Sequence, residues 1–234
     1  MVITGNLAEE LMAELECETV FTIPGLNIPV SESTVVTWII MAVVVLLCVI
    51  FVRNLSVENP GKKQQVLEIL VGKLHDFFYG LLGEHGKRYI PYLMTVIIYI
   101  GISNLIGYFG FKPPTKDMNV TLGLSVMSII LIEYAGIHRK GTKGWLKSFV
   151  QPLPILLPIN ILELFIKPLS LCMRLFGNVL GAFVIMELIK ILIPVIVPIP
   201  FSLYFDLFDG LIQAYVFVFL TSLFIKEAIE VEEG

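Results

Sequence analysis

Charged residues are scarce in this chain. Only 15% of its 234 residues are charged and 56% are hydrophobic, whereas about 25% of the residues in a soluble domain are charged. The mean hydropathy is +0.87. So few polar side chains cannot cover the surface of one or two soluble domains. The composition therefore argues against a soluble enzyme and indicates a protein that lipid surrounds.

The features of several binding functions are also missing. The formal net charge is −4 and no run of Lys and Arg occurs, which argues against a nucleic-acid partner. The three cysteines, Cys17, Cys48 and Cys172, lack the spacing of a disulfide framework or a metal site. No Gly-rich phosphate loop or paired nucleophile and base is visible. We therefore expect no metal, no cofactor and no nucleotide bound by the chain itself.

Long apolar runs are what the sequence does contain. Residues 33–52 and 89–111 include no charged side chain, and each run is long enough for a hydrocarbon core of about 30 Å. With three further apolar segments, they predict an all-α polytopic membrane protein. Its spans, about five in number, are expected near residues 33–52, 89–111, 120–137, 154–193 and 201–225.

The segment from 160 to 193 is too long to cross a membrane upright. Its 34 residues would make about 51 Å of helix, which fits the membrane only at a tilt beyond the usual range of about 0–40°. Pro168 allows a bend without ending the helix, because neighbouring helices can satisfy the freed carbonyl group in a membrane bundle. We therefore expect one bent, steeply tilted helix that ends before Pro194.

The distribution of Lys and Arg predicts the orientation of the chain. Residues 1–32 contain none, 112–119 contain two, 53–88 contain six and 138–148 contain four. Five spans place the two richest loops on one side, so the N-terminus is expected outside and the C-terminus in the cytoplasm. On this basis 1–32 is an extracytoplasmic segment and 33–234 a single membrane domain.

An additional helix is predicted between the first two spans, at about residues 62–88. Its apolar stripe suits a helix lying in the cytoplasmic interface, and equally suits an ordinary amphipathic helix packed on another subunit. The stripe comprises Val66, Leu67, Leu70, Leu74, Phe77, Phe78 and Leu81.

Charged side chains inside spans are costly, at roughly 2.5–3.5 kcal/mol each on insertion scales, and therefore mark functional candidates. Two pairs have local partners, because Glu163 and Lys167 are four residues apart and Glu187 and Lys190 are three apart. Arg174 differs, since no residue three or four positions away from it is acidic. A guanidinium does not lose its proton in proteins, so its carboxylate partner is expected on another helix or another chain.

Polar residues follow one face of the long helix and one face of the last span. If the two helices form an antiparallel hairpin, Arg174 and Gln213 both fall near the midplane, with Glu163 on the cytoplasmic side and Asp206 on the outer side. The polar groups then form two half-paths separated by an arginine, which argues against a simple open pore. The faces comprise Glu163, Lys167, Ser170, Arg174 and Asn178 on the long helix and Asp206, Asp209 and Gln213 on the last span.

Gly177 and Gly181 form a pair of small residues one turn apart beside Arg174. Such a pair lets another helix approach closely. The approaching helix can belong to this chain or to another one.

Four short motifs between residues 113 and 217 point to a known family. They are Arg174-Leu175-Phe176-Gly177-Asn178, preceded by Pro168-Leu169-Ser170-Leu171; Pro158-Ile159-Asn160 with Glu163; Pro113-Pro114-Thr115 with Asp117, Asn119, Val120 and Thr121; and Ile212-Gln213-Ala214-Tyr215-Val216-Phe217. Together they resemble the subunit a family of bacterial F-type ATP synthases, and the arginine motif is highly specific. The resemblance extends from about residue 100 to 222, whereas the first hundred residues agree in layout only.

The resemblance implies that Arg174 is the stator arginine, which faces a rotating ring of c subunits. It would attract the ionised carboxylate of a passing c subunit and block direct leakage of ions between the two half-channels. A cytoplasmic half-channel would be lined by Glu163, with Asn160 and Ser170 nearby. Asn178 and Gln213 would flank the arginine.

The outer half-channel departs from the family pattern. In some members a carboxylate nine residues after the arginine works with a His or Glu seven residues before the glutamine. Those positions are Phe183 and Asp206 here. The outer route is therefore expected to use Asp206, with Asp209 or Glu187 as further candidates.

The implied function is ion translocation coupled to rotation, by a multi-pass subunit of the cell membrane that binds no nucleotide. Its implied partners are the c-ring, the peripheral-stalk b subunits, the rest of the ATP synthase and membrane lipid. The resemblance places the ion-binding carboxylate on the c subunit, so this chain does not itself specify the ion; a proton is expected, with sodium as the alternative. A different class of function also remains open, namely a self-contained ion-coupled secondary transporter. Such proteins often have two related halves, and no internal repeat is visible.

Overall fold

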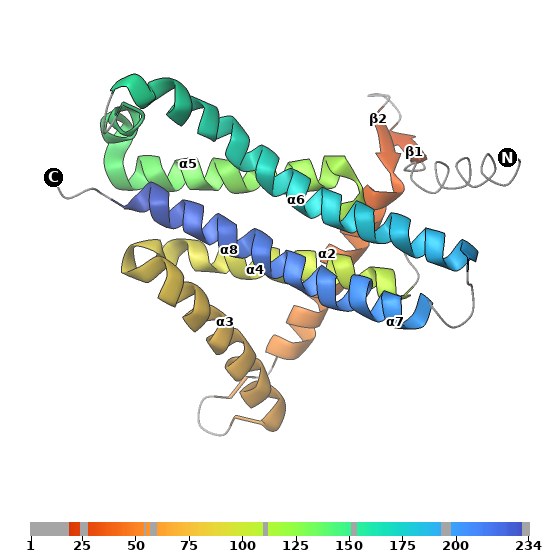
Figure 1. Ribbon diagram of the computed structural model, residues 1–234. Coiled ribbons are helices and arrows are strands. Elements are labelled where there is room, and N and C mark those ends of the chain that lie inside the picture. The colour runs from red at the N-terminus through yellow and green to blue at the C-terminus, as the bar shows by residue number, and fades with distance from the viewer. Residues whose placement is uncertain are drawn as a thin grey trace, which may run out of the picture.

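The structure is a computed structural model that describes residues 19–23, 28–53, 55–56, 60–109, 112–150, 154–192 and 198–230. The described chain is almost entirely helical (Figure 1), which confirms the predicted all-α polytopic fold. In chain order the elements are β1 (Thr19–Ile23), β2 (Ile28–Ser31), α2 (Glu32–Val52), α3 (Lys62–Gly86), η1 (Lys87–Tyr89), α4 (Ile90–Leu105), η2 (Ile106–Phe109), η3 (Pro114–Lys116), α5 (Met118–Ser148), η4 (Pro154–Leu156), α6 (Leu157–Leu192), α7 (Pro198–Ser202), η5 (Leu203–Asp209) and α8 (Gly210–Ile229). Of these, η5 is a π-helix and the other η elements are 3₁₀ helices.

Four segments of the described chain are long and apolar enough to cross a membrane, namely Glu32–Val52, Met118–Ser148, Pro154–Lys190 and Pro200–Ile229. The remaining predicted span, 89–111, is described as far as residue 109, where it comprises the last residue of η1, all of α4 and η2. Its α-helical part, α4, has 16 residues. The 3₁₀ turns at its ends add length, because they rise about 2.0 Å per residue.

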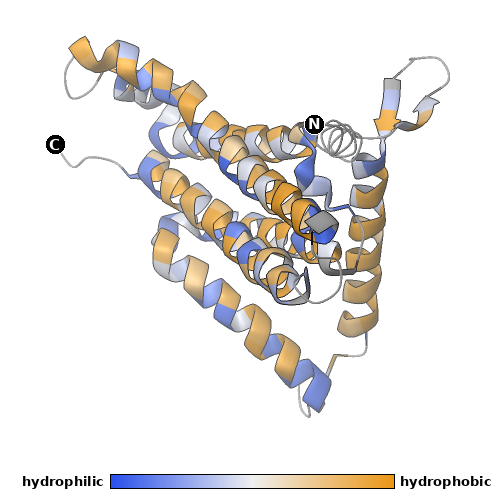
Figure 2. Cartoon of the chain, turned by 45° about the vertical axis from the view of Figure 1, so that its right-hand side comes forward, coloured by the Kyte–Doolittle hydropathy of each residue, from blue (hydrophilic) through white to orange (hydrophobic). Residues whose placement is uncertain are grey.

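Helix α2 leaves most of its surface from residue 41 onward uncovered by the rest of the described chain. Its charge is confined to Glu32 in the first turn, and Figure 2 shows it as apolar over its length. Only 6% of the most apolar stretch of 18 residues in α2 is buried. This surface is available to lipid or to another subunit.

The predicted helix at 62–88 is α3, which ends at Gly86. The two halves of its apolar stripe differ. Val66 and Leu70 are exposed, whereas Phe78 is fully buried where α3 packs on α4 and α8. The second half of the stripe therefore belongs to the core of this chain, and the first half is the part that remains free.

The long segment is one continuous helix, as predicted. α6 has 36 residues and passes through Pro168 without interruption. Figure 1 shows it crossing α5 obliquely and then running alongside α8. Lys167 of α6 contacts Glu227 near the end of α8, so α6 and α8 form the predicted antiparallel hairpin.

Helix α8 lies at the centre of the bundle. It packs against α3, α4, α5 and α6, and Figure 1 shows it between α6 and α4. Val218 and Ile225 of α8 have no exposed surface, and neither have Ile100 of α4 and Leu175 of α6. The apolar faces of four helices are thus buried on this one helix.

A two-stranded antiparallel hairpin, β1 and β2, precedes α2 and was not predicted. It is connected to the start of α5 through one carboxylate. Ser31 Oγ donates a hydrogen bond to Asp117 Oδ2 at 3.3 Å, and Asp117 Oδ1 accepts one from the Asn119 backbone N–H at 2.9 Å. Asp117 therefore caps α5 and holds the hairpin beside it.

Candidate functional site

Arg174 lies on an exposed polar face of α6. Ser170, Arg174 and Asn178 are all exposed, while Leu171 and Leu175 on the opposite face are buried. The spacing of three and four residues therefore produces the polar face that the sequence predicts.

The Arg174 guanidinium makes no hydrogen bond or ion pair with any residue that the structure describes. It keeps its charge, because arginine is not deprotonated in proteins. An uncompensated charge in an apolar span is costly. We therefore expect another chain to supply the carboxylate that balances it.

Gly177 and Gly181 leave the same face open. A Cβ atom added to either glycine would meet no atom within 4 Å. No described part of this chain packs on them. Of the two interpretations of this pair, the geometry favours close approach by a helix of another chain.

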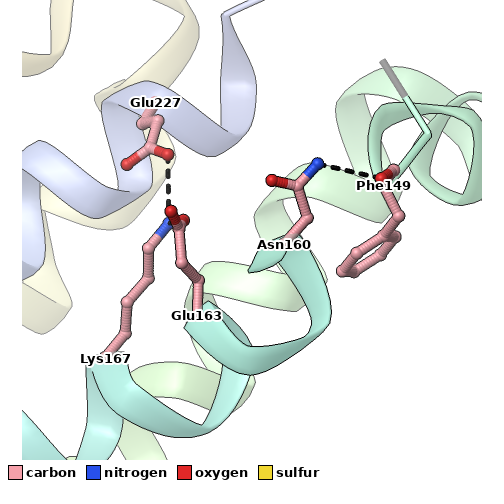
Figure 3. A network of polar contacts seen from close by, with 5 residues as sticks. All are labelled: Phe149, Asn160, Glu163, Lys167 and Glu227. Carbon is pink, nitrogen blue, oxygen red and sulfur yellow. Dashed lines mark hydrogen bonds and ion pairs between the residues drawn. The ribbon is translucent and has the colours of Figure 1, made fainter. Parts of the chain in front are cut away.

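An ion-pair cluster lies toward the N-terminal end of α6. Lys167 Nζ is 3.5 Å from Glu163 Oε2 and 3.0 Å from Glu227 Oε1, as Figure 3 shows. The predicted pair of Glu163 and Lys167 is confirmed. The sequence did not reveal the second carboxylate, because Glu227 lies 60 residues further along the chain.

This cluster borders an open groove of about 590 Å³, lined by α5, α6 and α8. Asn160 and Glu163 line it from α6, and Asn160 Nδ2 donates a hydrogen bond to the Phe149 carbonyl at 2.8 Å (Figure 3). Glu133 lines it from α5 and accepts a hydrogen bond from Trp145 Nε1 at 2.7 Å. Carboxylates from three helices thus line one open groove. Within the described ranges, neither this groove nor any other place gathers three His, Cys, Asp or Glu side chains suited to a metal ion.

The C-terminal part of α6 carries the second predicted pair. Lys190 Nζ lies 2.6 Å from Glu187 Oε1, which confirms the pair. One turn earlier on α6, the aromatic ring of Phe183 lies against the side chain of Lys116. Lys116 Nζ is 4.1 Å from the centroid of that ring, and Lys116 is 4% exposed.

The polar face of the last span begins in η5 and continues into α8. Gln213 is buried, and Asp209 precedes it by four residues, so the two side chains lie on one face of the helix. Within the described part of the chain no hydrogen bond connects Gln213 with Arg174. Asp206 lies in η5, but its side chain is outside the described residues.

Two linked hydrogen bonds connect α4 with η3 and with α8, and the sequence did not predict them. Asn104 Nδ2 donates to the Gly210 carbonyl at 2.9 Å, and Thr115 Oγ1 donates to Asn104 Oδ1 at 2.7 Å. Asn104 and Gly210 are 106 residues apart. No local spacing in the sequence could have indicated this contact.

The chain was compared with known proteins. Residues 34–226 match the family model described as ATP synthase A chain. ATP synthase subunit a of Moorella thermoacetica is 39% identical over 205 residues, which cover 85% of this chain and 90% of that protein. ATP synthase subunit a 2 of Acaryochloris marina is 31% identical over 92% of both chains. A protein of Propionigenium modestum named ATP synthase subunit a, sodium ion specific, is 34% identical over 86% of this chain and 75% of its own length.

Proposed function

Because the chain belongs to the ATP synthase A chain family, we propose that it provides two offset half-channels, separated by Arg174, beside a rotating ring of c subunits. As subunit a of an F-type ATP synthase it is a multi-pass membrane component that translocates ions. In this proposal the subunit binds no nucleotide itself. The observation that carries the proposal is the exposed Arg174, which has no partner among the described residues.

Arg174 acts on the carboxylate of the c subunit that passes it. Its fixed positive charge favours the ionised form of that carboxylate, so the carboxylate releases its ion on arrival. The same charge repels cations that would otherwise pass directly from one half-channel to the other. The open surface at Gly177 supports this role, because it lets a neighbouring helix approach α6 beside the arginine.

The groove beside Glu163 serves as the inner half-channel. Glu163 and Asn160 line it, and Ser170 lies on the same exposed face of α6 between the groove and Arg174. Lys167, Glu163 and Glu227 also line this groove, so their ion-pair cluster sets the charge along its wall.

The outer half-channel uses the polar face of the last span. Asp206 and Asp209 carry the ion there, and Gln213 and Asn178 connect them with the arginine. Asp209 and Gln213 are four residues apart and share one face of the helix, which supports this assignment. Glu187 is the weaker candidate, because Lys190 already engages its carboxylate.

The groove end of the bundle faces the cytoplasm in this proposal. Two contacts bring the predicted basic loops together at one end, since Arg88 Nη1 lies 3.4 Å from His138 Nε2 and Arg139 Nη2 lies 3.2 Å from His85 Nε2. We also propose that residues 1–32 lie outside and that 33–234 form one membrane domain. The uncovered surface of α2 is then available to the b subunits of the peripheral stalk.

The carried ion is a proton in this proposal. The name of the Propionigenium modestum relative makes sodium the alternative to test. Dependence of ATP-driven transport on added sodium, measured at constant pH, distinguishes the two.

Disulfide crosslinking tests where the c-ring lies. In a chain with C17S, C48S and C172A, the substitution G177C should crosslink to a cysteine placed beside the ion-binding carboxylate of the c subunit. G123C is the matched control, because Gly123 is equally open but lies on α5. Absence of the G177C crosslink in complexes that assemble and pump, or equal crosslinking by G123C, would contradict the proposal.

Removing Lys167 should slow ion flow through the inner half-channel. K167M leaves Glu163 and Glu227 facing the groove without their common cation. We expect about tenfold slower ATP-driven pumping, the equivalent of about 1.4 kcal/mol and the size of one hydrogen bond to a charged group. K143M is the control, because Lys143 is exposed and does not line the groove. Equal pumping by the two variants would show that the cluster has no part in conduction.

A further inference from the structure

The last span changes from π-helical to α-helical geometry at the junction of η5 and α8. Leu203–Asp209 form a π-helix, and α-helical geometry begins at Gly210. π-helical turns are rare and occur frequently at functional sites. The contacts that stabilise this junction can therefore affect function.

Asn104 of α4 binds the chain at the junction. Its Nδ2 donates to the Gly210 carbonyl at 2.9 Å, and its Oδ1 accepts from Thr115 Oγ1 at 2.7 Å. A backbone carbonyl can only accept, so the amide nitrogen must face Gly210 and the amide oxygen must face Thr115. Asn104 is 5% exposed and Thr115 is fully buried. Water therefore does not compete for these two bonds.

The contact also depends on glycine at position 210. A Cβ atom there would lie 2.9 Å from the Asn104 Cβ and 3.8 Å from the Asn104 backbone carbon. These atoms cannot move aside as the end of a flexible side chain can. Only glycine lets α4 and α8 approach this closely.

The junction directly positions a carboxylate of the proposed outer half-channel. Asp209 immediately precedes Gly210, and Gln213 follows Asp209 by four residues, so the two side chains share one face of the helix. A shift of the Gly210 backbone would therefore change the position of Asp209 relative to Gln213.

We infer that Asn104, oriented by Thr115, is a positioning residue for ion transfer in the outer half-channel. Its hydrogen bond to the Gly210 carbonyl fixes the change from π- to α-helix and so sets the position of Asp209 on the helix face that it shares with Gln213. The inference rests on the proposed role of Asp209 and Gln213 in ion passage. Groups that exchange an ion must be placed within a fraction of an ångström, and a displacement of about 1 Å can cost a hundredfold in rate.

The test measures ATP-driven ion pumping in membrane vesicles, normalised to the amount of assembled complex. N104L removes both hydrogen bonds at similar size, and T115V removes the hydroxyl that T115S keeps. We expect N104L to pump about tenfold to a hundredfold more slowly, T115V to be slowed less, and T115S to match the unmodified chain. S103A is the matched control, because the adjacent Ser103 hydroxyl is buried without a hydrogen-bond partner in the described part of the chain.

Normal pumping by assembled N104L overturns the inference, and so does a loss in T115S as large as that in T115V. D209N, measured in parallel, distinguishes this inference from the proposed function. Normal pumping by D209N overturns the role of Asp209 in the outer route and the inference with it, whereas slow D209N beside normal N104L overturns the inference alone. If N104L does not assemble, the difference between T115V and T115S decides.

Discussion

Replacing Arg174 with alanine is expected to abolish ATP-driven ion pumping by the assembled complex. The guanidinium has no partner among the described residues, so its whole charge is available to a carboxylate of the neighbouring ring. At a separation of about 4 Å and an effective dielectric constant of about 20, that attraction is about 4 kcal/mol. Its loss would remove both the release of the ion and the barrier between the half-channels. Dye quenching in inverted vesicles measures the result.

Arg88 provides the matched control for this experiment. It is exposed, and its partner is His138 within this chain. R88A should therefore pump at nearly the normal rate. Normal coupled pumping by R174A would refute the stator role, and a comparable loss in R88A would show that any missing arginine disturbs the complex.

Replacing Gly210 with alanine is expected to separate α8 from α4 and to destabilise the subunit. The new Cβ would lie 2.9 Å from the Asn104 Cβ, so the helices must move apart or distort. Overpacking of this kind typically costs about 1–3 kcal/mol. A lower melting temperature of the purified complex, together with slower pumping, would be the measured outcome.

Gly101 offers a comparison at the same helix pair. It lies on α4, and a Cβ added there would be 4.0 Å from Leu211 Cδ2, an ordinary van der Waals contact. G101A should therefore leave the melting temperature nearly unchanged. If G101A and G210A melted at the same temperature, close approach at position 210 would not be what stabilises this contact.

The features that the sequence predicted correctly depend on residues close together in the chain. The helix α6 follows from one long apolar run, and continues through Pro168 as expected. The pairs Glu163–Lys167 and Glu187–Lys190 follow from helical spacing alone. The lack of an acidic neighbour for Arg174 likewise follows from its own helix.

The features that the sequence did not predict depend on contacts between distant segments. Nothing local connects Lys167 with Glu227, or Lys116 with the ring of Phe183. The π-helix at Leu203–Asp209 also escaped prediction, because apolar runs with two aspartates are compatible with several helical geometries. Such contacts and local distortions are decided by packing between helices, which a single-sequence pattern does not record.

The central position of α8 has a consequence for the biosynthesis of the subunit. The apolar faces of α3, α4, α5 and α6 are buried on a helix that is translated after all of them. Before α8 is synthesised, the earlier helices lack the helix on which they all pack. At that stage α4 also lacks the Gly210 carbonyl that its Asn104 binds. Folding of this subunit is therefore completed only when α8 has inserted beside the earlier helices. A subunit truncated before α8 would leave the apolar faces of these helices without their common partner.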